Sequence, residues 1–291
     1  MKNIIVITGP TGVGKTKLSV ELAKKLNAEI INGDAMQVYK NMNIGTAKIK
    51  EEEKDGIIHH LFDICDVDTN YTVYDYQKDC RNKIKEILNK GKNVIIVGGT
   101  GLYIKSALYN YEFTEGTTYN EYNNLSNEEI YNKIMDFDNN IKVHVNNRKR
   151  LVRILNKIDN NEELSLKKDD LLYDAYFIGL TTDRSNLYKI IDDRVDIMIK
   201  NGLLDEIELL KDKFDNSKAL NTAIGYKEFI PYFKGEISLD EVINNIKKNS
   251  RHYAKRQYTF FNHQFDVKWF NTNYSDFSST IDEVYKYIIE N

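Results

Sequence analysis

The residue types and spacing at positions 9–16, Gly-Pro-Thr-Gly-Val-Gly-Lys-Thr, indicate phosphate chemistry. They directly follow an apolar run at residues 4–7 and precede a segment with helical spacing. Glycines there let several backbone N–H groups converge, Lys15 adds a positive charge, and the Thr16 hydroxyl can ligate Mg²⁺. A chance glycine turn would not combine all these features. We therefore interpret the segment as a P-loop that binds a diphosphate or triphosphate, in the manner of nucleotide-binding and ATP-binding proteins. Its predicted contacts are Gly9, Pro10, Thr11, Gly12, Val13, Gly14, Lys15 and Thr16.

Asp34 and Thr100 each follow another predicted strand, at residues 28–32 and 93–97. Because ligands bind at the carboxyl ends of parallel strands, we expect both residues to lie near Lys15. A carboxylate beside a phosphate loop can hold Mg²⁺ or act as a general base, whereas the alternative for Asp34 is a helix cap or turn. No predicted strand ends in an apolar run plus Asp, the element that holds the metal in ordinary ATPases, and this argues against a kinase or ATPase.

Two basic segments, residues 142–157 and 247–256, contain no acidic residue. Such segregation favours a polyanionic partner, although solvated helix faces are the alternative. Tyr253 and Tyr258 lie within or beside the second segment, where they could stack on bases. The cations are Lys142, Arg148, Lys149, Arg150, Arg153 and Lys157 in the first segment, and Lys247, Lys248, Arg251, Lys255 and Arg256 in the second.

The elements that must position these residues alternate between strands and helices, which predicts an α/β fold with a mainly parallel sheet. The polar segment 113–143 has weak helical periodicity and is predicted to be a small helical insertion; a disordered loop is the alternative. Residues 1–112 and 144–291 would form a P-loop-type core. Predicted strands span 3–8, 28–32, 93–97 and 175–181, and predicted helices span 14–27, 73–89, 186–200, 203–213, 221–233, 239–262 and 279–289.

The composition of the chain limits the kinds of partner, metal site and cellular location to be expected. The net charge of −3 means that any nucleic-acid surface must be local. The 2 cysteines have no metal-ligand spacing, which predicts a reducing cytosol and no zinc site. There is no signal-peptide pattern and no apolar run of the ~18–20 residues that a membrane span needs. The adjacent His59 and His60 would point opposite ways and are expected to be structural.

With these segments identified, the chain resembles the tRNA dimethylallyltransferases, also called tRNA isopentenyltransferases, over nearly its full length. Each block alone is modest evidence, but their order is specific. The matching blocks are residues 9–16, Gly33-Asp34-Ala35-Met36-Gln37-Val38-Tyr39, Asn43-Ile44-Gly45-Thr46-Ala47-Lys48, His59-His60-Leu61-Phe62-Asp63, Gly98-Gly99-Thr100-Gly101-Leu102-Tyr103, Arg184, Arg194-Val195-Asp196, Gly202-Leu203-Leu204, Ile224-Gly225-Tyr226-Lys227-Glu228 and Tyr253-Ala254-Lys255-Arg256-Gln257.

The resemblance implies transfer of a dimethylallyl group from dimethylallyl diphosphate to N6 of the adenosine 3′-adjacent to the anticodon. The tRNAs concerned read codons that start with U. Asp34 would accept the N6 proton, and Thr100 would hydrogen-bond the diphosphate. Lys15, Arg194 and Mg²⁺ on Thr16 would stabilise the leaving group. The adenine would be flipped out and read by Gln37.

The resemblance also implies a surface for the anticodon stem-loop, gripped by the insertion, in a cytoplasmic monomer without a membrane segment. Departures from the family pattern are Ala35, Phe260, Asn262 and residues 144–147. The alternatives are an adenylate isopentenyltransferase, a kinase or ATPase, and a non-catalytic RNA-binding protein. The implied tRNA contacts are Asp34, Ala35, Met36, Gln37, Thr100, Lys149, Arg150, Arg153, Gly225, Tyr226, Lys227, Lys255, Arg256 and Gln257.

Overall fold

The chain divides into two compact units in a computed structural model that describes residues 2–113, 119–162 and 170–291. The first unit contains residues 1–108 and 171–291, and the second contains residues 109–170. Each unit has its own apolar core. The second unit therefore extends past residue 143, the predicted end of the insertion.

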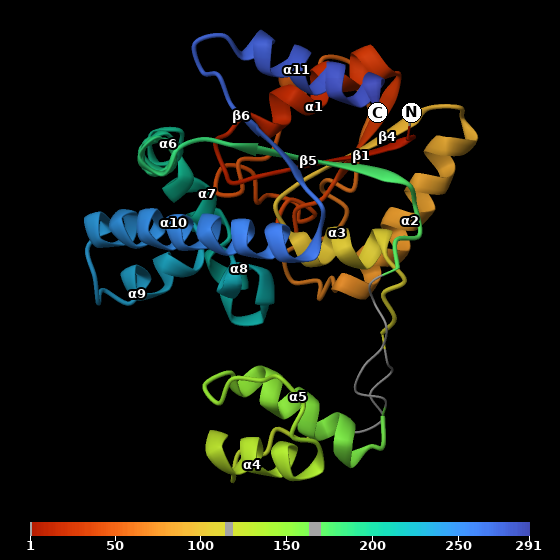
Figure 1. The fold of residues 1–291 in the computed structure, drawn as a ribbon. Coiled ribbons are helices and arrows are strands. Elements are labelled where there is room, and N and C mark those ends of the chain that lie inside the picture. Colours follow the sequence, from red (N-terminus) through yellow and green to blue (C-terminus); the bar gives the residue numbers. More distant parts are fainter. Residues whose placement is uncertain (1, 114–118, 163–169) are drawn as a thin grey trace. The chain divides into compact units, whose positions relative to one another are not determined.

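A six-stranded parallel sheet forms the centre of the first unit (Figure 1), which confirms the predicted α/β class. The strand order is β3-β2-β4-β1-β5-β6, so the strand before the P-loop is central and covered on both faces. The edge strands β3 and β6 were not predicted, because they are short and lack a continuous apolar run. The strands are β1 (Ile4–Thr8), β2 (Ala28–Asn32), β3 (His59–His60), β4 (Asn93–Val97), β5 (Ala175–Thr181) and β6 (Lys268–Asn271).

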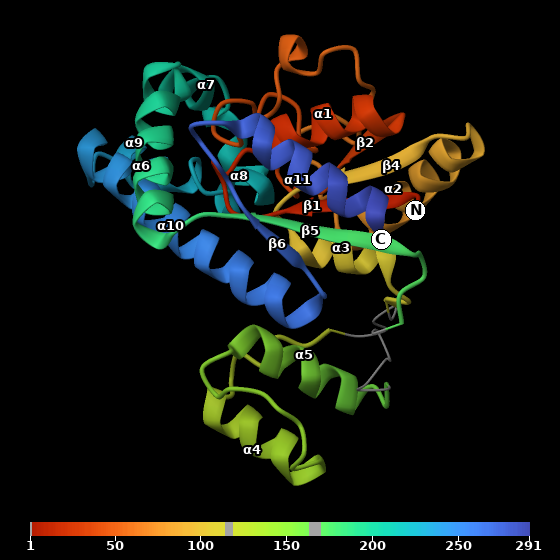
Figure 2. The same cartoon turned by 45° about the horizontal axis from the view of Figure 1, so that its top comes forward.

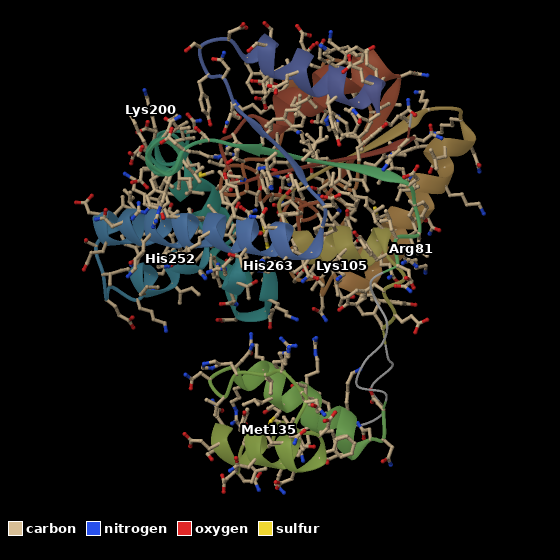
Figure 3. The ribbon with its side chains drawn as sticks, in the orientation of Figure 1. Arg81, Lys105, Met135, Lys200, His252 and His263 are labelled. Atoms are coloured by element: carbon tan, nitrogen blue, oxygen red, sulfur yellow. The ribbon has the colours of Figure 1, made fainter. Side chains whose placement is uncertain are left out.

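Helices cover both faces of this sheet (Figures 1 and 2). On one face lie α1 (Lys15–Leu26) and α11 (Phe277–Glu290). On the other lie α2 (Val73–Asn89), α3 (Gly101–Leu108) and α10 (Leu239–Gln264). Lys105 of α3 donates a hydrogen bond of 2.6 Å to the side chain of Gln264, and Arg81 of α2 donates to the carbonyls of Ser106 and Ala107 (Figure 3). These bonds join α2, α3 and α10 to one another.

Between β5 and α10 the chain forms one long helix, α6, followed by short helices. The predicted single helix over 221–233 is wrong, since the backbone breaks at Gly225, where φ is +93° and a helix cannot continue. The elements are α6 (Arg184–Lys200), α7 (Leu203–Leu209), α8 (Lys218–Thr222) and α9 (Ile230–Phe233), with 3₁₀ turns at Lys211–Asn216 and Lys227–Phe229 and, earlier in the chain, at Glu51–Glu53.

The second unit is built from α4 (Asn127–Phe137) and α5 (Arg148–Asp159). Ile130 and Ile134 of α4 pack with Leu151 and Leu155 of α5 in a separate apolar cluster. The first basic segment lies largely on α5 and so belongs to this unit, not to the core as its predicted border implied. The reason is that α5 has an apolar face of its own, which it buries against α4.

Candidate active site

The P-loop joins the carboxyl end of β1 to the first turn of α1. Gly12 and Gly14 have φ values of +89° and +92°, a region that favours glycine. A Cβ on Gly14 would also collide with the ring of Phe277 in α11. Lys15 and Thr16 follow as the first two residues of α1, so backbone N–H groups and a positive helix end face the same space.

Lys15 is half-buried and held toward the loop, with Nζ donating to the Pro10 carbonyl at 2.7 Å. Burial, reinforced by the nearby charge of Arg194, lowers the pKa of Lys15 to about 7, while Asp34 opposes that shift. An anion beside Lys15 would compensate for the lost solvation. This environment therefore suits a negatively charged ligand.

Arg194 projects from α6 toward the same cavity. Its Nε is buried and forms no hydrogen bond to any residue of the described ranges. Burial lowers the pKa of Arg194 from its usual value, and the negative charges of Glu53 and Asp34 partly offset this effect. A buried guanidinium nitrogen without a partner is costly, so it indicates a ligand acceptor such as a phosphate oxygen.

Asp34 lies just beyond β2, in a turn organised by Asn32. The Asp34 N–H donates to Asn32 Oδ1 at 2.9 Å, and the Met36 N–H donates to Asp34 Oδ1 at 2.9 Å. Asn32 is itself held by Tyr76, whose hydroxyl donates to its carbonyl. Burial raises the pKa of Asp34, although the Met36 N–H and Lys15 oppose that rise. A raised pKa makes this carboxylate a stronger base than an exposed aspartate.

Thr100 lies just beyond β4 and contacts the Asp34 turn. Its Oγ1 accepts a hydrogen bond of 3.0 Å from the Ala35 N–H, and its own N–H donates to the Gly33 carbonyl at 3.1 Å. A Cβ on Gly98 would overlap the backbone of Gly33, so glycine permits this close approach. The ends of β1, β2 and β4 thus meet at one edge of the sheet.

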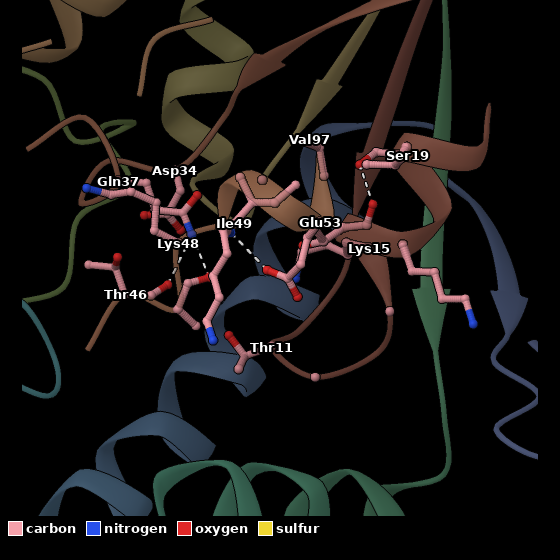
Figure 4. Close-up of a pocket in the computed structure, with 18 of the residues that line it drawn as sticks. Thr11, Lys15, Ser19, Asp34, Gln37, Thr46, Lys48, Ile49, Glu53 and Val97 are labelled. Atoms are coloured by element: carbon pink, nitrogen blue, oxygen red, sulfur yellow. Dashed lines mark hydrogen bonds between the residues drawn. The ribbon is translucent and has the colours of Figure 1, made fainter. Parts of the chain in front are cut away.

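A cavity of about 1240 Å³ opens at this edge (Figure 4). Its lining includes Lys15, Asp34, Gln37 and Arg194, so charged groups from three separate parts of the chain share one space. Apolar side chains line other parts of the wall. They are Val20, Ile44, Ala47, Ile49, Phe62, Val97, Ile197 and Met198.

Some cations of the second basic segment, residues 247–256, are paired with acidic side chains. Lys247 forms an ion pair of 2.6 Å with Asp196, and Arg251 pairs with Asp192, both acids lying on α6. Lys255 and Arg256 are exposed on α10. Only part of this segment therefore presents open positive charge.

Three residues with an implied tRNA contact are buried: Gly225, Tyr226 and Gln257. Tyr226 is 0% exposed, and its hydroxyl donates to Glu206 at 2.6 Å. Gln257 is 5% exposed and donates from Nε2 to the Gly99 carbonyl at 3.0 Å, while its buried Oε1 finds no partner among the described residues. Gln257 borders the cavity, whereas Tyr226 packs behind its wall.

In the second unit, Lys149, Arg150 and Arg153 are exposed on α5. Arg148 differs, because its guanidinium donates to the carbonyls of Leu125 and Tyr122 and so supports the unit itself. The side chain of Asn147 caps α5 by accepting from the Arg150 N–H at 3.3 Å.

His59 and His60 have local partners. His60 Nε2 lies 2.7 Å from the Glu29 carboxylate, and His59 Nδ1 lies 2.9 Å from the Ile57 carbonyl. In residues 2–113, 119–162 and 170–291, no group of three or more His, Cys, Asp or Glu side chains could hold a metal ion. None of the helices described there is long and apolar enough to cross a membrane.

Sequence reasoning missed Lys48 and Glu206 as residues that shape the site. Lys48 lines the cavity and donates from Nζ to the Tyr39 carbonyl at 2.7 Å and to Asp63 at 2.6 Å. Glu206 holds the loop at residues 43–45. Lys48 ends one of the family-like sequence blocks, whereas no sequence pattern marks Glu206.

Comparison with known proteins places these features in one family. A family model described as IPP transferase matches residues 37–264. The tRNA dimethylallyltransferase of Bacillus subtilis is 45% identical over 283 residues, covering 92% of this chain and 90% of that relative.

Solved structures agree over the full chain. The tRNA delta(2)-isopentenylpyrophosphate transferase of Staphylococcus epidermidis is 39% identical, with a TM-score of 0.76, over 99% of this chain and 98% of its own. A eukaryotic dimethylallyltransferase described as acting on tRNA is 30% identical, with a TM-score of 0.82, over 98% of this chain and 78% of its own.

Proposed function

The chain belongs to the IPP transferase family of tRNA dimethylallyltransferases, and we propose that it prenylates N6 of the adenosine 3′-adjacent to the anticodon. Dimethylallyl diphosphate is the proposed donor, and the acceptors are tRNAs that read codons starting with U. One observation supports this chemistry most directly: a single cavity is lined by two half-buried cations, Lys15 and Arg194, and one half-buried carboxylate, Asp34. The cations suit a diphosphate leaving group, and the carboxylate suits a proton acceptor.

In the proposed reaction, N6 of adenine attacks C1 of the dimethylallyl group. The N6–C1 bond forms, the C1–O bond breaks, and diphosphate leaves with the electron pair. Asp34 takes the proton released from N6. Lys15, Arg194 and the P-loop N–H groups stabilise the charge that develops on the leaving oxygens. Thr100, hydrogen-bonded to the Asp34 turn, would orient the diphosphate next to this base.

Mg²⁺ is the proposed cofactor, and Thr16 is the residue that would hold it. The donor chemistry fits, because Mg²⁺ is commonly bound by one or two protein oxygens together with substrate phosphates and waters. Thr16 lines the cavity next to Lys15. When bound, the ion would neutralise charge on the diphosphate.

We further propose that the adenine is flipped out of the anticodon loop and that Gln37 reads its edge. The remaining tRNA contacts would come from Lys227, Lys255 and Arg256 in the first unit and from exposed α5 cations in the second. Gly225 would contribute through its backbone, whose positive φ shapes the turn before Lys227. Tyr226 and Gln257, whose side chains are buried, would act by shaping the neighbouring surface. A cytoplasmic monomer fits this role, and Cys65 and Cys80 are free thiols.

The direct test is to incubate the purified protein with Mg²⁺ and dimethylallyl diphosphate, adding unmodified tRNA in one reaction and AMP in another. Nucleoside mass spectrometry should detect N6-dimethylallyladenosine from tRNA only. Product from AMP alone would make the protein an adenylate isopentenyltransferase. If neither acceptor is modified, the proposal is wrong, and ATP turnover becomes the next measurement.

Replacing Arg150 by alanine should weaken tRNA binding and reduce its salt dependence. Each lost phosphate contact lowers the slope of log K against log salt by about 0.7 to 0.9. Filter binding at several salt concentrations measures this slope. Lys133→Ala is a matched control, since it removes an exposed cation from α4 instead of α5. Equal slopes for Arg150→Ala and the unmodified protein would mean that Arg150 does not face RNA.

A further inference from the structure

Glu206, near the middle of α7, holds a loop that is distant in sequence. Its carboxylate accepts backbone N–H bonds from three consecutive residues: Asn43 at 2.9 Å, Ile44 at 2.7 Å and Gly45 at 3.1 Å. A fourth donor is the Tyr226 hydroxyl, at 2.6 Å. A carboxylate is an acceptor-only group, so it can satisfy all four donors at once.

The loop is also held by packing. Tyr226 is fully buried, and its ring occupies the space that a Cβ on Gly45 would need. Ile44 packs in the same apolar cluster as Tyr226. The loop therefore contacts both the buried ring of Tyr226 and the Glu206 carboxylate, which are themselves hydrogen-bonded to each other.

This loop leads directly to Gln37. Thr46 follows the clamped residues, and its hydroxyl donates to the Met42 carbonyl at 2.6 Å, which closes the loop on itself. The Thr46 carbonyl accepts a hydrogen bond of 3.0 Å from Gln37 Nε2 (Figure 4). The position of the loop thus selects one orientation of the Gln37 amide, with nitrogen toward Thr46 and Oε1 left as an acceptor.

We propose that Glu206 is a positioning residue for recognition of the acceptor base, acting through the 43–46 loop and the Thr46 carbonyl on the Gln37 amide. The proposal rests on the proposed function, in which Gln37 reads adenine. An amide held in this orientation offers Oε1 to an N–H donor, such as the exocyclic amine of adenine. A loop released from Glu206 would let the amide rotate and lose that preference.

A double-mutant cycle tests this assignment. Glu206→Gln keeps the side-chain shape but turns an N–H₂ group toward backbone N–H donors. We expect kcat/KM for tRNA to fall about tenfold, because bonds to a charged acceptor are lost. The KM for dimethylallyl diphosphate should stay within about twofold, since Glu206 does not line the cavity. In a Gln37→Ala background, Glu206→Gln should lower kcat/KM for tRNA by less than about twofold, because Glu206 acts only by orienting the Gln37 amide.

Glu208→Gln, an exposed change on the same helix, is the matched control and should leave both constants unchanged. Tyr226→Phe is a second variant for the case that Glu206→Gln folds poorly, because it removes only one of the four donors. It should lower kcat/KM for tRNA by less than Glu206→Gln does, and this loss should also disappear in the Gln37→Ala background. Single-turnover measurements allow slow variants to be compared. Additive losses, or no loss for Glu206→Gln, would overturn the proposal. Absence of any tRNA prenylation by the unmodified protein would instead reject the proposed function.

Discussion

Asp34→Ala is expected to lower kcat for tRNA prenylation by about 10²- to 10⁴-fold, the usual contribution of a general base. The N6 proton would lose its acceptor while the phosphate site and the cationic surfaces stay in place. Rapid-quench measurement of product nucleoside gives kcat, and filter binding gives the affinity for tRNA. The affinity should change little. A loss of tRNA binding with normal kcat would refute the role of Asp34 as base.

The buried environment of the Asp34 carboxyl also has predictable effects on stability and on the pH dependence of activity. Burial raises the pKa of Asp34, so the folded chain holds its proton to a higher pH than the unfolded chain does. Ionised Asp34 therefore costs stability above that pKa, and Asp34→Asn should leave Tm unchanged or higher at neutral pH. Activity of the unmodified protein should fall as pH drops through the raised pKa, because the base becomes protonated. Asp34→Glu retains a carboxylate and should keep more activity than Asp34→Asn.

Lys15→Ala is expected to reduce kcat/KM for dimethylallyl diphosphate by about 10²- to 10³-fold. The substitution removes a half-buried charge from the leaving-group site, where preorganised electrostatics contribute most. Steady-state kinetics with varied dimethylallyl diphosphate at saturating tRNA measures the effect. Lys25→Ala, a more exposed change on the same helix, serves as the control. Normal kinetics for Lys15→Ala would reject the P-loop as the diphosphate site.

The lowered pKa of Lys15 predicts that binding of the diphosphate substrate is linked to proton uptake. With its pKa at about 7, Lys15 is largely neutral above that pH, and diphosphate binding should recharge it by taking up a proton. Binding should therefore weaken as pH rises above about 7. Calorimetry at pH 8 in two buffers of different ionisation enthalpy should show proton uptake, and Lys15→Ala should show less. Equal uptake in both proteins would mean that another group titrates.

Lys15 also has a stability effect of opposite sign to that of Asp34. The unfolded chain holds the Lys15 proton to a higher pH than the folded chain, so stability from this group rises as pH increases above about 7. The two functional residues thus each oppose folding in their charged forms. This is typical of a site arranged for a ligand that is absent from the free protein.

The sequence alone determined the features that depend on neighbouring residues. The P-loop is one continuous segment, and the central strands are apolar runs, so both could be read locally. The carboxyl-end rule then brought Lys15, Asp34 and Thr100 to one sheet edge, since parallel strands share their polarity. The helical insertion was also predicted, but its downstream border was not. That border depends on the packing of α5 against α4, a tertiary contact that no local sequence pattern indicates.

Tertiary structure alone decided the features that depend on distant contacts. Glu206 meets Asn43 across 163 residues, and no local pattern encodes that clamp. The positive charges of Lys247 and Arg251 are paired with Asp196 and Asp192 on another helix, α6. Local spacing specifies which side chains a segment offers, whereas burial and charge pairing arise only when separate segments come together. For this reason the candidate reactive groups could be named from the sequence, while their protonation and positioning required the fold.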